Sequence, residues 1–271
     1  MNLAAAAGVR GVRRAARRTH ARLTLAATLA AAACAAALLG SPPPAGASAT
    51  ETAIAATATA PNPAANIPLG PLPRACAGAP TGAACEDFAI ERLDGARAKL
   101  GLGPYLLPRG FVALSPPRQW LVLANLDRIA YAQRPIRGLV LQLDAIAKQG
   151  ALAREDPNPW GAVAGLPGQS QIAFASNWAG GQDNALLAYY GWMYDDGYGG
   201  PNLDCSSPSA AGCWGHRQGV LAFASGPALS MGAAAIVHGD PTYALTIVAT
   251  TTAPWPYSYT WARAQADGAG R

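Results

Sequence analysis

The sequence predicts an α+β fold, in which helices come first along the chain and paired strands come last. Three amphipathic helical patterns occupy residues 86–153, and two β-rich apolar runs lie at 231–237 and 243–252. The turn-forming stretch Gly239-Asp240-Pro241 separates the two runs and favours their pairing. Helices followed by paired strands are typical of α+β folds rather than of alternating βαβ units.

Residues 1–47 have the layout of a secretory signal peptide. Six arginines and no acid make a basic n-region, and an apolar Ala/Leu run from Leu23 to Gly40 follows. Ala45-Gly46-Ala47 then matches a small-x-small cleavage site. The alternative is a membrane anchor, but the run is mostly alanine and ends in Ser-Pro-Pro-Pro. We therefore expect a secreted protein, extracellular or in the cell envelope, with no transmembrane anchor after cleavage.

Removal of this segment changes the charge balance. The full chain has 20 Lys+Arg against 15 Asp+Glu. Six of the basic residues and none of the acids lie in 1–47, so the mature chain keeps 14 basic and 15 acidic groups, a net of −1. Nothing in that balance indicates nucleic acid as a partner.

Four cysteines remain once Cys34 is removed with the signal, and they form two close couples, Cys76/Cys85 and Cys205/Cys213. An even number of cysteines in an oxidising compartment is typical of disulfides, and four cysteines allow three connectivities. Adjacency favours a bond within each couple, worth about 2.5 kcal/mol in the chain-entropy model. No C-x2-C or H-x3-H spacing supports zinc on these cysteines, and we expect no cofactor.

The composition divides the mature chain into three parts. Residues 48–80 are rich in alanine, threonine and proline and carry little charge, which predicts a disordered linker. A folded domain is expected over 81–262. The last residues, 263–271, are expected to form a flexible tail.

The first helix is predicted over Glu86–Leu100. Its apolar residues recur at helical spacing, acids favour its N-terminal end, and basic residues favour its C-terminal end. Gly101 is placed to cap it. The apolar segment 105–107 is suited to a short strand.

Further helices are predicted over Pro116–Gln133 and Gly138–Ala153. The first opens on two prolines suited to a helix start, and the second has a leucine and alanine face. The Pro/Gly/Asn-rich stretch 155–170 predicts a loop. Ala185–Met193 predicts a fourth helix, and 195–213 a glycine-rich loop with the second cysteine couple, before a short apolar segment.

Four local motifs occur in order along the domain: LDGARAKLGL at 93–102, Leu143 with Ala147 and Ala151, Ser176-Asn177-Trp178-Ala179, and Gly215-His216-Arg217 after Trp214. Together they resemble the CAP superfamily of cysteine-rich secretory proteins, venom antigen 5 and plant pathogenesis-related proteins. The resemblance covers roughly residues 85–252. It implies a three-layer α-β-α sandwich, in which the third motif is a turn beside a central cleft.

The family's cleft often carries two histidines and two glutamates that bind a divalent metal. At the matching positions this chain has Gly150, Ser176, Asp195 and His216, so one of the four ligands is kept. A metal site needs several converging ligands, so the resemblance implies a degenerate cleft with no metal. A calcium site in the acidic loop 195–204 does not match the D-x-[DN]-x-[DN]-G spacing.

The candidate cleft residues are His216, Asp195, Ser176, Asn177 and Arg217. His216 with Asp195 would form a carboxylate–imidazole pair suited to general-base chemistry, with Ser176 the one hydroxyl nearby. No G-x-S-x-G motif accompanies them, so we assign no catalytic residue. We interpret His216 as a hydrogen-bonded structural histidine and Arg217 as an ion-pairing or carbonyl-capping residue.

The predicted function is that of a non-catalytic extracellular or cell-envelope binding module. Its expected ligands are a lipid, a small apolar molecule or a cell-wall glycan. The alternatives are a secreted hydrolase using His216 and Asp195, and a purely structural surface protein. Trp178, Trp192 and Trp214 are expected in the core, because large aromatics near small residues pack sheet against helix.

Overall fold

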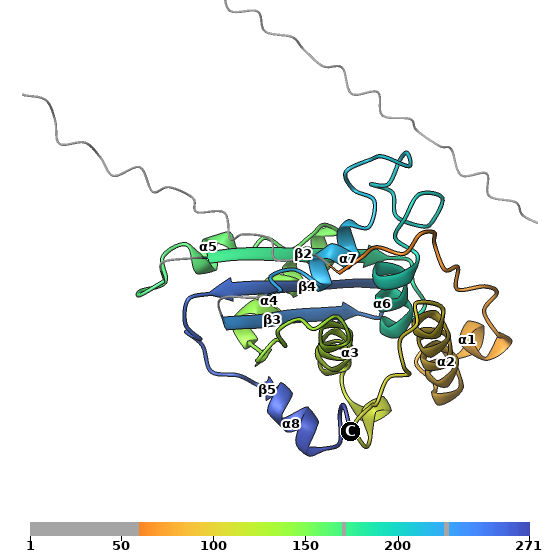
Figure 1. Cartoon of the computed structure of the whole chain (residues 1–271), viewed down its shortest axis with the longest axis horizontal. Coiled ribbons are helices and arrows are strands. Elements are labelled where there is room, and N and C mark those ends of the chain that lie inside the picture. The colour runs from red at the N-terminus through yellow and green to blue at the C-terminus, as the bar shows by residue number, and fades with distance from the viewer. Residues whose placement is uncertain (1–59, 170–171, 225–227) are drawn as a thin grey trace, which may run out of the picture. The chain divides into compact units, whose positions relative to one another are not determined.

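The computed structural model describes residues 60–169, 172–224 and 228–271 (Figure 1). The predicted signal peptide and the start of the predicted linker, 48–59, lie outside these described residues. The predicted α+β class is confirmed, because helices combine with a five-stranded mixed sheet. The finer assignment to a CAP-type sandwich remains a prediction.

The sheet has the strand order β2-β4-β3-β1-β5. Its main part consists of β2 (Ile172–Gly180), β3 (Ala228–Ile236) and β4 (Thr242–Thr250), with β4 antiparallel to both neighbours. The two-residue strand β1 (Gly138–Leu139) runs parallel to β3 and antiparallel to β5 (Tyr259–Thr260). β3 and β4 correspond to the two β-rich runs that the sequence pattern predicts.

Helices pack on both faces of the sheet (Figure 1). α4 (Leu141–Ala153) lies on one face, against β3 and β4. The other face carries α3 (Pro116–Ala130), α6 (Ala185–Tyr194) and α7 (Gly215–Val220). α2 (Ala83–Lys99) packs outside this layer, against α6.

Strand alternation gives each helix layer its own core. In β4, Leu245 and Ile247 join the large cluster under α3 and α6, whereas Val248 joins the smaller cluster under α4. Gly232 of β3 faces α4 at close range. A Cβ at this position would lie 2.1 Å from the backbone carbonyl carbon of Leu143, so the helix can approach β3 only over a glycine.

A buried polar cluster joins α2, α3 and α6. The carboxylate of Asp127 forms an ion pair with Arg97 and accepts hydrogen bonds from the hydroxyls of Tyr105 and Tyr189 at 2.6 and 2.7 Å. Tyr194 adds a further hydroxyl at 3.2 Å. Because Asp127 is fully buried, each of these donors offsets the cost of removing its charge from water.

The predicted helices match the observed ones within a few residues. Each boundary has a local cause: two prolines open α3, Gly101 adopts a left-handed φ of 73° after α2, and the Asn184 side chain accepts from the Leu187 N–H at 3.0 Å to cap α6. The remaining helices are short: α1 (Arg74–Gly78), η1 (Phe111–Ala113), α5 (Trp160–Val163) and α8 (Trp261–Ala266).

Two strand expectations need correction. Residues 105–107 form no strand, because the Tyr105 N–H donates to the Asp94 side chain at 2.7 Å and not to a neighbouring strand. Ser176-Asn177-Trp178-Ala179 is not a turn but the second half of β2, paired over its whole length with β4. Its small and polar residues hide the strand pattern in the sequence.

The described part of the predicted linker lies against the domain. Ile67 is buried, donates its N–H to the Tyr194 carbonyl at 2.8 Å and accepts from the Tyr190 hydroxyl at 2.8 Å. The predicted tail, 263–271, is also packed on the domain. Its first residues belong to α8, and the Gly270 N–H donates to the Leu106 carbonyl at 2.8 Å. Backbone hydrogen bonds hold these segments, and composition does not reveal such bonds.

Candidate functional site

A pocket of about 530 Å³ lies at the outer edge of β2. Its walls come from the end of α4, from α6, from the loop 201–204 and from His216 at the start of α7. The lining is rich in acids: Glu155, Asp156, Asp195, Asp196 and Asp204. A cleft of this size and mixed lining is a candidate ligand site.

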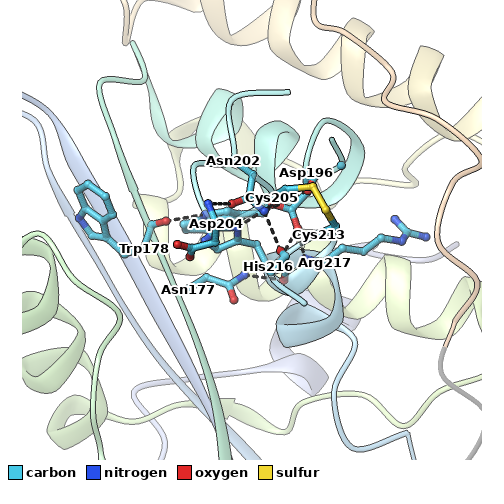
Figure 2. Close-up of polar contacts among 12 residues, drawn as sticks. Asn177, Trp178, Asp196, Asn202, Asp204, Cys205, Cys213, His216 and Arg217 are labelled. Atoms are coloured by element: carbon cyan, nitrogen blue, oxygen red, sulfur yellow. Dashed lines mark hydrogen bonds and ion pairs between the residues drawn. A yellow bond between two sulfur atoms is a disulfide. The ribbon is translucent and has the colours of Figure 1, made fainter. Parts of the chain in front are cut away.

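His216 and Asp196 form the central pair of this pocket (Figure 2). Nδ1 of His216 lies 2.7 Å from Oδ1 of Asp196, which also accepts from the Asn202 side-chain amide at 2.8 Å. The other carboxylate oxygen accepts from the His216 backbone N–H at 2.9 Å. Because the carboxylate only accepts, we assign the proton to Nδ1, which leaves Nε2 as the basic nitrogen of the neutral ring.

β2 and α7 hold this pair in place. The side-chain amide of Asn177 on β2 donates to the His216 carbonyl at 2.8 Å (Figure 2). Gly219 lies directly over Asn177, and a Cβ on Gly219 would lie 2.3 Å from the Asn177 Oδ1. Trp214 precedes α7 with a left-handed φ of 61° and donates its N–H to the Asp196 carbonyl at 3.0 Å. The strand therefore fixes the position of His216 through the backbone.

Burial and neighbouring charges shift the pKa values of three groups in the pocket. Burial opposes the charged form of His216, but the hydrogen bond to Asp196 and the carboxylates of Asp196, Asp156 and Asp204 raise its pKa above the ordinary value. Burial raises the pKa of Asp195 to about 6, with a further contribution from Asp196. Burial also raises the pKa of Asp156, against the opposing effects of His216 and the Trp178 N–H.

Trp178 of β2 also lines the pocket, and its indole points away from the His216–Asp196 pair (Figure 2). Its carbonyl accepts from the Trp192 indole N–H at 3.2 Å, and the guanidinium of Arg154 lies 5.6 Å from its ring centre. Arg154 also pairs with Asp240 at 2.5 Å. Trp192 is buried as predicted, whereas Trp178 and Trp214 are only partly buried.

The pairing predicted between His216 and Asp195 is wrong. Asp195 lines the pocket, but it caps the C-terminal end of α6, and the next residue, Asp196, turns toward His216. Ser176 lies on β2 with its hydroxyl donating to Thr246 at 2.9 Å, and it does not line the pocket. The structure therefore brings His216 and Asp195 into one pocket and leaves the candidate hydroxyl of Ser176 outside it.

Arg217 and Asn177 act in the framework of the site. Arg217 is 1% exposed and donates to the Met193 carbonyl and the Tyr131 hydroxyl, both at 2.7 Å. It therefore caps a carbonyl, which agrees with one of the two roles expected from the sequence. Asn177 is fully buried, points toward α7 and does not line the pocket.

Both predicted disulfides, Cys76–Cys85 and Cys205–Cys213, are present. The second closes the loop 205–213, which joins the pocket-lining residues 201–204 to α7 (Figure 2).

No three His, Cys, Asp or Glu side chains converge on a metal position within the described ranges. No helix there is long and apolar enough to cross a membrane.

Sequence reasoning missed Asp196, Asp156 and Trp178 as pocket residues. Asp195 and Asp196 are adjacent, so composition cannot tell which one turns toward the histidine. Asp156 follows α4 in a loop that only the fold brings to β2. The third residue, Trp178, is predicted in the core, but β2 is an edge strand of the sheet, which no local pattern indicates.

No protein-family model matches this chain, and neither curated proteins nor solved structures give a match. The CAP resemblance of the four motifs therefore remains a prediction.

The pocket offers a base and several acids, but no hydroxyl or thiol nucleophile among its described residues. Nε2 of His216 has no hydrogen-bond partner in the part of the chain that the structure describes. The same described lining includes no serine, threonine, cysteine or tyrosine. A reaction here would have to activate water or use a carboxylate as the nucleophile, whereas binding needs only the donors, acceptors and aromatic rings that are present.

Proposed function

We propose that the domain is a non-catalytic binding module of the cell envelope or extracellular space, and that its ligand is a glycan. The pocket beside Trp178 and His216 would hold this ligand. The observation that carries the proposal is the lining, which joins an aromatic wall and several carboxylates but has no nucleophilic hydroxyl or thiol among its described residues.

The carboxylates favour a glycan over the other two predicted ligand classes. An apolar chain or lipid tail in this pocket would take water from the exposed carboxylates of Glu155, Asp156 and Asp204 without replacing their hydrogen bonds, which is costly. Sugar hydroxyls can donate to those carboxylates, and a sugar ring can pack on the indole of Trp178. A glycan therefore satisfies the polar and the aromatic part of the lining together.

The rival function is a hydrolase, now with Asp196 as the partner of His216. The tight orientation of the imidazole favours it, since such a pair can remove a proton from water. The surrounding acids oppose it for esters and amides, because their tetrahedral intermediates carry an oxyanion that nearby carboxylates destabilise.

A location outside the cytoplasm is supported by the two disulfides.

Calorimetric titration of the full chain with the N-acetylglucosamine tetramer, and co-sedimentation with insoluble peptidoglycan, would test the proposal. We expect saturable binding that Trp178→Ala weakens at least tenfold. Trp160→Ala is the matched control, because Trp160 is 52% exposed and lies outside the pocket lining. Equal binding by all three proteins would refute the site.

Mass spectrometry of the same mixtures separates binding from hydrolysis. The proposal expects no shortened sugars after prolonged incubation. Sugar release that disappears in His216→Ala would establish the hydrolase instead. Binding of a fatty-acid probe in place of both glycans would move the ligand to the lipid class.

A further inference from the structure

The edge of β3 that faces β1 is covered along part of its length. β1 has only two residues, and it meets β3 at the pair Leu139 and Met231. The Val140 N–H then donates to the Met231 carbonyl at 2.9 Å, after which the chain turns into α4. The second half of β3 therefore has no neighbouring strand on this side.

Backbone alternation fixes which groups are left open there. Since Met231 directs its carbonyl toward β1, Ala233 and Ala235 direct their N–H and C=O groups to the same side. The Ala233 N–H donates to the Asp144 carboxylate at 2.9 Å. No backbone partner within the described ranges meets the Ala233 carbonyl or either group of Ala235 on this side.

These open groups lie in a groove of about 500 Å³. The end of β3 forms its floor, and in Figure 1 β3 runs between α3 and α4. Pro116 and Pro117 line it from the start of α3, and Asp144, Ala145 and Lys148 line it from α4. The ammonium group of Lys148 is exposed and pairs with no carboxylate of the described residues.

We propose that this groove binds an extended, acidic peptide segment of a second protein, which adds to the sheet as a strand beside Ala233 and Ala235. Strand addition requires unpaired backbone groups along one edge of a sheet. The Ala233 carbonyl and the N–H and carbonyl of Ala235 are three such groups on this edge. An edge strand without such a partner normally carries charge or proline or lies under a covering segment, but the open stretch 233–236 of β3 has no charged residue or proline, and Asp144 covers one N–H alone. The inference is independent of the glycan pocket.

The walls of the groove define the chemistry of this segment. Side chains of an added strand alternate between the two faces of the sheet. Those on the α3 side would meet Pro116 and Pro117, which favours small apolar residues. Those on the α4 side would meet Asp144, Ala145 and Lys148. The Asp144 carboxylate already accepts the Ala233 N–H, whereas the ammonium group of Lys148 is unpaired among the described residues, which favours an acid at the position beside Lys148.

The probe is a capped peptide of sequence Val-Glu-Val-Glu-Val, titrated into the full chain. We expect saturable binding that weakens at least tenfold when the peptide's backbone nitrogens are methylated, because the strand then loses its donors. Lys148→Glu should weaken binding about threefold to fivefold. Lys99→Glu is the matched control, because Lys99 is the other lysine of the chain and lies on α2 outside the groove.

Carbodiimide coupling locates the contact, since it joins a peptide glutamate to a nearby lysine amine. We expect the cross-link at Lys148 and not at Lys99, and we expect Ala235→Pro to abolish it while the melting temperature stays above the working temperature. Equal coupling to both lysines, or binding unchanged by methylation, would overturn the proposal.

The same reaction without peptide identifies other occupants. A cross-link from Lys148 to Glu51 within one molecule would mean that the chain's own N-terminal segment fills the groove. Dimers joined through Lys148 would mean that a second copy fills it. Either result would overturn the proposal of a separate partner, and the absence of both supports it.

Discussion

His216 and Asp196 lie on consecutive structural elements, and the same aspartate binds both the ring and the backbone of the histidine. Asp196 directly follows the C-cap residue of α6, and His216 lies in the first turn of α7. The carboxylate is 2% exposed, so its charge depends on these donors and on Asn202. The pair therefore stabilises the connection that forms one wall of the pocket.

His216→Ala should lower the melting temperature. The substitution removes one donor from a buried carboxylate, at a cost of about 1–3 kcal/mol in the free energy of unfolding. His238→Ala, at an exposed position, should leave the melting temperature unchanged. Thermal unfolding followed by circular dichroism measures both. An unchanged melting temperature for His216→Ala would show that the pair is not structural.

The domain should be more stable at pH 5.5 than at pH 8. His216 has a raised pKa in the folded state, so its stabilising effect is present below the unfolded pKa and is lost as the pH rises through the folded one. Asp195 acts in the same direction, because a folded pKa of about 6 means that the folded state holds its proton more tightly than the unfolded chain does.

Asp195→Asn separates the two contributions. It removes a partly buried charge beside Asp196, so we expect higher stability at pH 8 and a flatter pH dependence between pH 4 and 6. The exposed Asp87→Asn is the control for the loss of an acid. Urea unfolding across this pH range measures both, and parallel curves for Asp195→Asn and the wild type would contradict the assignment.

Arg97→Met should be strongly destabilising. It leaves the fully buried Asp127 without its cationic partner, and removal of one member of a buried ion pair costs about 3–5 kcal/mol. Arg263→Met breaks an exposed i,i+4 pair with Asp267 and should cost less than about 1 kcal/mol. Denaturant unfolding of the two variants gives the comparison. Similar losses in both would show that Asp127 is neutral in the fold.

Sequence patterns predicted the elements that depend on local causes. α2 and α4 have periodic apolar residues, α3 and α6 are buried over most of their length, and all four have recognisable ends. The cysteine couples are close enough for adjacency to decide their pairing. β3 and β4 flank a turn whose residues are diagnostic. β2 is not predicted because its polar Ser176 and Asn177 donate to partners that are distant in sequence, the Thr246 hydroxyl and the His216 carbonyl.

The candidate site was also predicted only in part, because some of its contacts join residues that are distant in sequence. A motif marks His216, which lines the pocket, but its carboxylate partner is Asp196 and not Asp195. A one-residue difference at the end of a helix depends on how the chain leaves the last turn, and helix ends are the least predictable positions. The order of the strands was equally hidden, and it alone brings Trp178 to an edge.

Gly232→Ala and Gly95→Ala should have opposite effects, because one glycine is required by packing and the other is not. At Gly232 a Cβ would lie 2.1 Å from the Leu143 backbone, and a backbone cannot move aside as a side chain does. We expect α4 to be displaced from β3 and the domain to lose about 1–3 kcal/mol or more. At Gly95, in the interior of α2, a Cβ meets nothing within 4 Å. Alanine there should stabilise the domain by about 0.5–1 kcal/mol, since it restricts the unfolded chain and favours the helix. Chemical unfolding of both variants tests the pair, and a stable Gly232→Ala domain would mean that α4 does not pack on β3 as described.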